Sequence, residues 1–148
     1  MRWRLMRPIA LVLVLVLGAA SVSTAADQFV VIVNPSVAGS NIRRADLAAV
    51  FLKKAPRWGG GALAVPVDQS GTAAVRKAFS EAVIRQPVDQ VVQYWQKLMF
   101  TSSPLRPPSV KASDAEVIVF VAKTSGAVGY VTPGAALPAG VKTLLLIH

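Results

Sequence analysis

Apolar residues along the chain change repeatedly from short continuous runs to helical spacing. The run at residues 29–33 is rich in β-branched side chains and stops at Asn34-Pro35, which is typical of a strand buried on both faces, as parallel sheets require. Residues 44–54 carry apolar side chains three and four positions apart and end in two lysines, which suit the negative end of a helix dipole. The pattern therefore predicts a buried strand followed by a helix.

The same succession follows downstream. Residues 63–67 predict a second short strand, and because Pro66 has no N–H for the ladder, we expect the strand to end or to meet a sheet edge there. Residues 68–72 are polar or small and predict a connecting loop. Apolar residues from Val75 to Val83 recur at helical spacing, which predicts an amphipathic helix.

Pro87 opens a third predicted helix, with Asp89 in its first turn near the positive end of the dipole. Its expected buried stripe consists of Val88, Val91, Val92, Trp95, Leu98 and Met99. Residues 102–109 contain three prolines and predict a loop.

The segment that follows this loop is ambiguous between strand and helix. Residues 117–121 favour a strand by propensity, but they also fit helical spacing, and Ser113 with Glu116 forms a capping box before them. We predict a helix that Ser125-Gly126 closes. Further along the chain, residues 128–131 and 141–147 predict two strands around a loop. The order of these elements predicts a single layered α/β domain.

The first residues have the three parts of a secretory signal. Three arginines precede an apolar run, residues 9–17, and small residues follow up to Ala26. The run is shorter than the roughly 20 residues of a membrane-spanning helix. We expect residues 1–26 to be a signal peptide cleaved after Ala25 or Ala26, with a retained anchor as the alternative. Residues 27–148 would then be the exported domain, without a stable membrane span.

The net charge of the chain limits the classes of partner that we expect it to bind. The chain has sixteen basic and seven acidic residues, and removal of residues 1–26 would take away three arginines and no acid, leaving a net charge of +6. Such a charge favours anionic ligands and anionic surfaces. The basic residues are scattered and lack the interleaved aromatic side chains of a nucleic-acid groove, so we expect no nucleic-acid partner.

Two residue counts exclude much of enzyme chemistry. The chain has no cysteine and a single histidine, His148, which excludes a disulfide framework, a thiolate zinc site, an iron–sulfur cluster and a cysteine nucleophile. No Gly-x-Ser-x-Gly pattern surrounds Ser70, and the seven carboxylates form no ligand motif. We therefore predict a protein that is not an enzyme and that has no metal site and no cofactor.

The sequence Ser70-Gly71-Thr72 offers chemistry for an anion, because it is predicted to join a strand to a helix. Such a loop presents unpaired N–H groups and the positive end of the helix dipole. Gly71 lets the backbone approach the anion, and the hydroxyls of Ser70 and Thr72 can donate to its oxygens. A tetrahedral oxyanion such as phosphate or sulfate fits this arrangement. The alternative is that Ser70 and Thr72 only cap the helix.

Four stretches share their order and spacing with a known family. They are residues 47–54 with Arg57-Trp58, residues 65–72, Phe79 with the helices after it, and residues 126–131. Together they resemble the exported phosphate-binding component of bacterial ABC transporters, in the type 2 periplasmic-binding-protein superfamily. The resemblance runs from residue 29 to residue 131. Members are two-lobed, and this chain is too short for two lobes, so the resemblance implies an α/β domain similar to one lobe.

The resemblance also implies a site. In the family, the residues that match Ser70, Gly71 and Thr72 contact phosphate. The family places an arginine shortly before the matching serine, whereas this chain has Pro66-Val-Asp-Gln there, which removes a strong charge-assisted contact. Arg76, one helical turn after Thr72, is the candidate replacement, since side chains lean toward the helix N-terminus.

Asp68 and Asn34 complete the set of candidate ligand-binding residues, and each has two interpretations. Asp68 either accepts a hydrogen bond from a protonated phosphate or organises the loop by bonding to nearby N–H groups. Asn34 either lines a cleft at the carboxyl ends of the strands or forms a turn before Pro35.

Two functional hypotheses follow. The first is an exported, periplasmic solute-binding-like protein that binds phosphate or a similar oxyanion, in phosphate uptake with an ABC transporter permease. With one lobe the site would be open to water, so its affinity should lie below that of a closing clamp. The second is a ligand-free interaction module that keeps the lobe fold and uses its surface for a membrane or envelope partner, such as an envelope protein. A basic group near the N–H donors favours the first hypothesis, and Asp68 filling the site favours the second.

Overall fold

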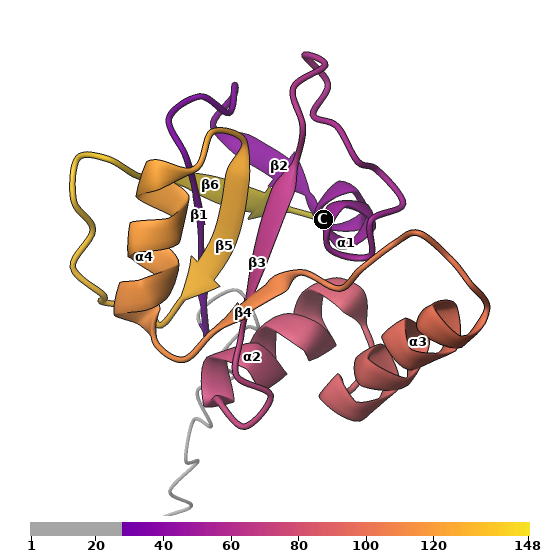
Figure 1. Ribbon diagram of the computed structural model, residues 1–148. Coiled ribbons are helices and arrows are strands. Elements are labelled where there is room, and N and C mark those ends of the chain that lie inside the picture. Colours follow the sequence, from indigo (N-terminus) through magenta and orange to yellow (C-terminus); the bar gives the residue numbers. More distant parts are fainter. Residues whose placement is uncertain (1–27) are drawn as a thin grey trace, which may run out of the picture.

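The computed structural model describes residues 28–148, so the predicted signal peptide lies outside the described residues. This part of the chain forms one mixed sheet with helices on both faces (Figure 1). In sheet order the strands are β2 (Asn41–Arg43), β6 (Lys142–Ile147), β1 (Val30–Val33), β5 (Ala127–Val131), β3 (Val65–Gln69) and β4 (Ser109–Lys111). The helices are α1 (Arg44–Phe51), α2 (Ala74–Phe79), its π-helical continuation η2 (Ser80–Ile84), α3 (Val88–Phe100) and α4 (Asp114–Lys123). The predicted α/β fold is therefore confirmed.

Each face of the sheet carries its own apolar core. α4 covers one face, where Val117 packs in a buried cluster with Ile32 of β1. α1 and α2 cover the other face, where Phe51 and Phe79 pack in a second cluster with Val33 of β1. Successive side chains of β1 thus enter opposite cores, and the strand is buried on both faces as its continuous apolar run predicts.

The direction of β1 differs from the prediction. β1 pairs antiparallel with both of its neighbours, β5 and β6, whereas β3 runs parallel to β5 and β4. A continuous apolar run reports burial on both faces, and helices can cover both faces of a strand of either direction. The expectation of a parallel strand was therefore wrong for β1.

β3 lies two residues further along the chain than predicted. Pro66 lies beside β5 alone, because β4 pairs with β3 only from Val67 onward. The sheet therefore has an edge at Pro66, as expected, but the strand continues past it. Asp68 and Gln69, predicted in a loop, are the last residues of β3 and are buried. Pairing with β4, which the sequence did not predict, extends β3 over these two polar positions.

The helices agree with the apolar periodicity in all four predicted segments. The ambiguous segment forms α4, in which the Ser113 hydroxyl accepts a hydrogen bond from the Glu116 N–H at 3.3 Å. Glu116 in turn accepts one from the Ala112 N–H at 2.8 Å. These two bonds satisfy backbone donors at the start of the helix, so the capping signal outweighs the strand propensity of the following residues.

The stripe predicted for α3 is wider than the buried surface. Val91 and Trp95 are buried, but Val92 and Met99 are exposed. α3 packs chiefly against η2 and stands at the side of the molecule (Figure 1). One neighbouring element covers only a narrow strip of a helix, which leaves part of the apolar face uncovered.

Gly129, in the middle of β5, should not tolerate a side chain. A Cβ at this position would lie 2.7 Å from Val117 Cγ1 and 2.8 Å from Val67 Cγ1, and both valines are fully buried. We predict that Gly129→Ala lowers the free energy of unfolding by about 1–3 kcal/mol, because the packed core has no room for the methyl group. Urea denaturation followed by circular dichroism measures the change.

Gly60→Ala is the matched control for this substitution. Nothing lies within 4 Å of a Cβ placed on Gly60, so its effect should stay within about 0.5 kcal/mol. Equal stability of the Gly129→Ala variant and the parent chain would contradict the packing seen around β5.

Candidate functional site

The turn from β3 to α2 contains the predicted Ser70-Gly71-Thr72 sequence, and it lies at the carboxyl end of β3. The Ser70 N–H donates to the Lys111 carbonyl at 3.0 Å, which ties the turn to β4. The Ser70 carbonyl accepts from the Ala73 N–H at 3.0 Å, which closes the turn. Gly71 and Thr72 are exposed at its tip. The structure therefore forms the strand, turn and helix that the sequence predicts.

Neither hydroxyl of this turn caps the helix. The residue that precedes α2 is Ala73, and no side chain accepts a hydrogen bond there. The Ser70 and Thr72 hydroxyl oxygens instead lie 3.1 Å from each other. Within residues 28–148, no acceptor bonds to the N–H groups of the first turn, residues 74–76. The capping alternative thus does not describe the side chains of this turn, and the helix start keeps free donors.

Arg76 points from α2 back toward the end of β3, beneath the turn. Its Nη1 donates to the Gln69 carbonyl at 3.3 Å and lies 2.6 Å from Asp68 Oδ2. The side chain is 7% exposed, and its Nε has no hydrogen-bond partner. A basic group therefore approaches the turn from below, and the Asp68 carboxylate already offsets its charge.

Asp68 has both oxygens engaged inside the protein. One oxygen pairs with Arg76, and the other accepts a hydrogen bond from the Tyr130 hydroxyl of β5. Burial raises the pKa of Asp68, although Arg76 and Tyr130 act in the opposite direction. Burial and the adjacent carboxylate both raise the pKa of Tyr130. These contacts favour the structural interpretation of Asp68, in which it organises the strand end.

The network continues through residues that sequence reasoning missed. Gln69 donates two hydrogen bonds to Tyr130: its N–H donates to the Tyr130 hydroxyl at 3.1 Å, and its Nε2 donates to the Tyr130 carbonyl at 3.0 Å. Nε2 also donates to Asp114 Oδ1 at 2.7 Å, and this carboxylate accepts from the Thr132 N–H at 3.2 Å. The signal that could have identified Tyr130 is its hydroxyl, the one polar side-chain group in the buried strand β5.

Asn34 lies apart from the turn. Its side-chain amide donates to the carbonyls of Val121 and Ala122 at 2.9 and 3.2 Å, and its Oδ1 accepts from the Ser36 N–H at 2.9 Å. Its backbone N–H bonds to Ala127, the first residue of β5. Because β5 runs parallel to β3, this is the end of the sheet opposite to Ser70. The structure therefore does not bring Asn34 to the other candidates, and its bonds match the turn-forming interpretation.

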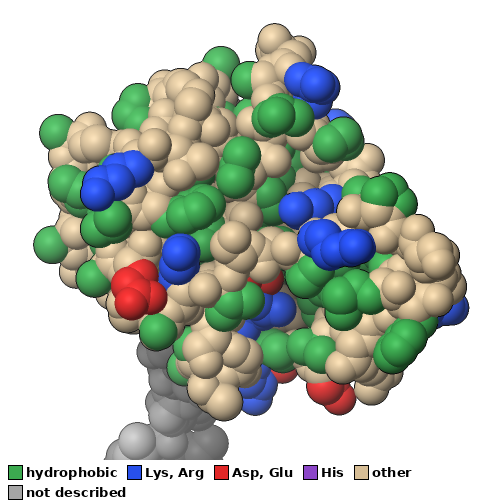
Figure 2. All heavy atoms as spheres, viewed as in Figure 1, with side chains coloured by type: hydrophobic (Ala, Val, Ile, Leu, Met, Phe, Trp, Pro, Cys, Tyr) green, Lys and Arg blue, Asp and Glu red, His purple; other side chains and the backbone are tan. Residues whose placement is uncertain are grey.

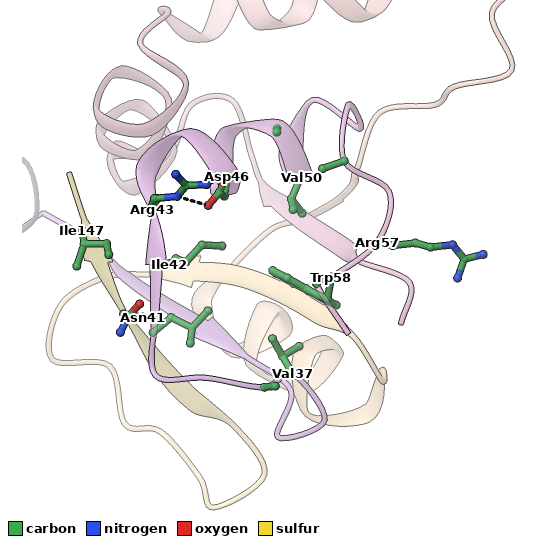
Figure 3. A pocket seen from close by; sticks show the side chains of 14 residues that line it. Val37, Asn41, Ile42, Arg43, Asp46, Val50, Arg57, Trp58 and Ile147 are labelled. Atoms are coloured by element: carbon green, nitrogen blue, oxygen red, sulfur yellow. Dashed lines mark hydrogen bonds and ion pairs between the residues drawn. The ribbon is translucent and has the colours of Figure 1, made fainter. Parts of the chain in front are cut away.

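Away from the β3–α2 turn, a hollow of about 580 Å³ opens between α1, β2 and the segment around Trp58 (Figure 3). Its walls are mainly apolar and include Ile42 and Val50. Arg43 and Asp46 at its rim bond to each other through Nε and Oδ2 at 2.7 Å. Arg57 extends away from the hollow (Figure 3). No set of free polar groups converges here, so the β3–α2 turn remains the candidate site.

Residues 28–148 contain no group of three or more His, Asp or Glu side chains placed to hold a metal ion. No helix in that range has the length and apolar character that crossing a membrane requires.

Comparisons with known proteins concern the fold. No protein-family model matches the sequence, and no curated protein is similar to it in sequence. Several solved structures share the fold. An ABC-type phosphate transport receptor from Vibrio cholerae is 18% identical, with a TM-score of 0.59 over 81% of this chain and 46% of that one. PstS from Borrelia burgdorferi is 18% identical, with a TM-score of 0.60 over 81% of this chain and 47% of that one.

The third structure is described as a phosphate ABC transporter substrate-binding protein with bound phosphate from Clostridium perfringens. It is 15% identical, with a TM-score of 0.61 over 81% of this chain and 45% of that one. The chain thus spans about half the length of the structures it matches. These matches confirm the predicted fold resemblance, with an extent that corresponds to a single lobe. The matched proteins are described as transport receptors and binding proteins, not as enzymes.

Removing the charge of Asp68 should make the folded protein much less stable. We predict that Asp68→Asn lowers the free energy of unfolding by about 3–5 kcal/mol, because it leaves the Arg76 charge buried without its partner. Chemical denaturation of the two proteins measures the difference. Asp46→Asn breaks the exposed pair with Arg43 and should cost less than about 1 kcal/mol. Similar losses in both variants would contradict the role given to the buried pair.

Asp114 should make stability sensitive to acid. Burial alone would raise its pKa, but hydrogen bonds from Gln69 and Thr132 lower it below its ordinary value. A lowered pKa in the folded state adds stability above the unfolded-state pKa, and this stability is lost as the pH falls through the folded-state pKa. We therefore predict a smaller loss of stability on acidification for Asp114→Asn than for the parent chain.

Asp89→Asn is the control for Asp114→Asn, since Asp89 also lies in the first turn of a helix but bonds only to the adjacent Gln90 N–H. Thermal unfolding of all three proteins between neutral pH and acid separates the two positions. An identical pH dependence in the Asp114→Asn variant and the parent would contradict the prediction.

Proposed function

We propose that the chain is an exported solute-binding-like protein that binds phosphate or a similar oxyanion at the β3–α2 turn. The observation that carries this proposal is the set of N–H groups at residues 74–76, which have no acceptor within the described part of the chain. Gly71, Thr72 and Ala74 are exposed beside these donors. The binding groups would be these N–H groups with the hydroxyls of Ser70 and Thr72.

The chemistry of the turn suits a small anion. α2 and η2 run on without a break from Ala74 to Ile84, so several turns of aligned peptide dipoles stand behind the N–H groups. An anion at such a helix start gains both hydrogen bonds and a favourable dipole. The two hydroxyl oxygens, 3.1 Å apart, can turn their protons toward a tetrahedral oxyanion instead of toward each other.

Arg76 would strengthen the site from below without contributing a full free charge. Its guanidinium lies under the turn, but Asp68 compensates the charge within the core. The arginine that the family resemblance expects shortly before Ser70 is missing. We therefore expect an affinity below that of a site with a free, bidentate guanidinium.

The similar folds supply the biological setting of the proposal. The matched proteins from Vibrio cholerae and Clostridium perfringens are described as a phosphate transport receptor and a phosphate ABC transporter substrate-binding protein. By analogy, this chain would act in the periplasm and deliver its anion to an ABC transporter permease. The chain spans about half of their length.

One observation favours a second candidate function. The Asp68 carboxylate forms an ion pair with the guanidinium of Arg76. An arginine that is paired within the protein is the arrangement expected if the lobe no longer binds an anion. In that case the domain would be a ligand-free interaction module of the cell envelope with a protein partner. A titration with phosphate separates the two candidates.

Calorimetric titration of inorganic phosphate into the purified chain tests the proposed function. We predict saturable binding that Thr72→Val weakens about fivefold to tenfold, since one hydrogen bond to a charged acceptor is lost. Sulfate in a parallel titration indicates whether the site takes oxyanions in general.

Thr143→Val is the matched control, because Thr143 is exposed on β6, which β1 and β5 separate from β3. It should bind phosphate as the parent chain does. The absence of binding heat in a folded protein at millimolar phosphate would refute the proposed function and leave the interaction module. Equal weakening by both variants would place the site elsewhere.

A further inference from the structure

The C-terminal end of α3 exposes apolar side chains to solvent. Phe100, the last residue of the helix, is 87% exposed, and Met99 is 47% exposed. Val92 lies two helical turns before Met99, on the same side, and is also exposed. We call Val92, Met99 and Phe100 the α3 tip. Isolated exposed apolar residues are ordinary, but Met99 and a nearly bare Phe100 end the helix together, and Val92 lies two turns before them on the same side, so the three form a patch.

The α3 tip is held outward by the packing of the rest of the helix. Val91 and Trp95 fill the contact with the body of the protein, and the Tyr94 hydroxyl donates to the Leu52 carbonyl at 3.1 Å. These contacts fix the opposite side of α3 against the domain. The exposed residues therefore cannot turn inward without the loss of buried contacts.

The charges beside Met99 and Phe100 are positive, whereas Asp89 lies three positions before Val92 on the same helix. From residue 90 to residue 113 the sequence contains Lys97, Arg106 and Lys111 and no acidic residue. Lys97 precedes Phe100 by three positions and is thus its neighbour on the helix surface. Arg106 is folded onto the loop after the helix, where its Nη1 donates to the carbonyls of Ser103 and Leu105 at 2.8 and 3.0 Å. On the face in Figure 2, hydrophobic and basic side chains lie over α3 and this loop, and acidic side chains lie at the lower edge of the molecule.

We propose that the α3 tip is a membrane-contact site that inserts into the surface of a bilayer containing anionic lipid. Phe100 and Met99 would enter the boundary between headgroups and acyl chains, while Lys97 and Arg106 would pair with lipid phosphates. Apolar side chains flanked by basic residues bind such surfaces through burial of apolar area and through attraction to anionic headgroups. This inference is independent of the anion site at the β3–α2 turn.

A lipid surface suits the α3 tip better than a second protein molecule. Stable protein interfaces engage about 20–30 residues on each side, with a polar rim of both charge signs. The α3 tip is instead a narrow projection of three apolar residues, and the residues near Met99 and Phe100 in the sequence, from residue 90 to residue 113, include basic but no acidic ones. A bilayer requires no matching surface shape, so a small projection is sufficient for reversible contact.

A local fluorescence measurement tests this proposal on the full chain. The sequence has no cysteine, so Thr101→Cys, next to Phe100, accepts a single environment-sensitive label. We expect its emission to shift to the blue, and a lipid-borne quencher to reach it, with vesicles of phosphatidylglycerol and phosphatidylcholine but not with phosphatidylcholine alone. Adding Lys97→Gln and Arg106→Gln should weaken this response about tenfold or more. Phe100→Ser should remove the blue shift.

Gly60→Cys, in an open surface turn with nothing within 4 Å of its Cβ, carries the control label. It reports contact of the molecule with lipid through any other segment, and it should not respond. An unchanged label at position 101 in the presence of anionic vesicles overturns the proposal. So does an equal response of both labels. A blue shift at position 101 that needs only a higher protein concentration would assign the α3 tip to self-association instead.

Discussion

The ion pair between Asp68 and Arg76 constrains the whole of the candidate site. Both side chains are almost completely enclosed, and a charge that has left water must be matched within the protein. Asp68 belongs to β3 and Arg76 to α2, so the pair joins the strand and the helix on either side of the turn. Tyr130 attaches the pair to β5, and Gln69 extends the connection to the start of α4. These buried polar contacts therefore fix the residues on both sides of the exposed turn.

This arrangement determines what kind of anion site the turn can be. Because Asp68 offsets Arg76, attraction for an anion depends on backbone donors and hydroxyls more than on net charge. Such donors are fixed in direction by the helix, which favours a small, symmetrical oxyanion over a large charged molecule. The same pair explains why one structure supports two functional candidates. It holds the turn in place, which an anion site needs, and it also pairs Arg76, the basic group nearest to the turn, with Asp68.

The sheet of this domain has an apolar core on each of its faces. Both cores lie within residues 28–148, and the chain spans about half the length of the structures it matches. The apolar surface at the end of α3 lies outside both cores. The proposed anion site would therefore lie at the β3–α2 turn, and the proposed membrane contact would lie elsewhere, at the end of α3.

Local patterns in the sequence determined the helices, the longer strands and the position of Ser70-Gly71-Thr72 between a strand and a helix. Apolar period and the Ser113–Glu116 capping box act over a few residues, so they can be recognised without the fold. Only the tertiary structure decided the direction of β1, the short polar strands β2 and β4, and the burial of Asp68 with Arg76 and Tyr130. It also placed Asn34 at the far end of the sheet. These features depend on partners distant in sequence, which packing selects and local propensity does not encode.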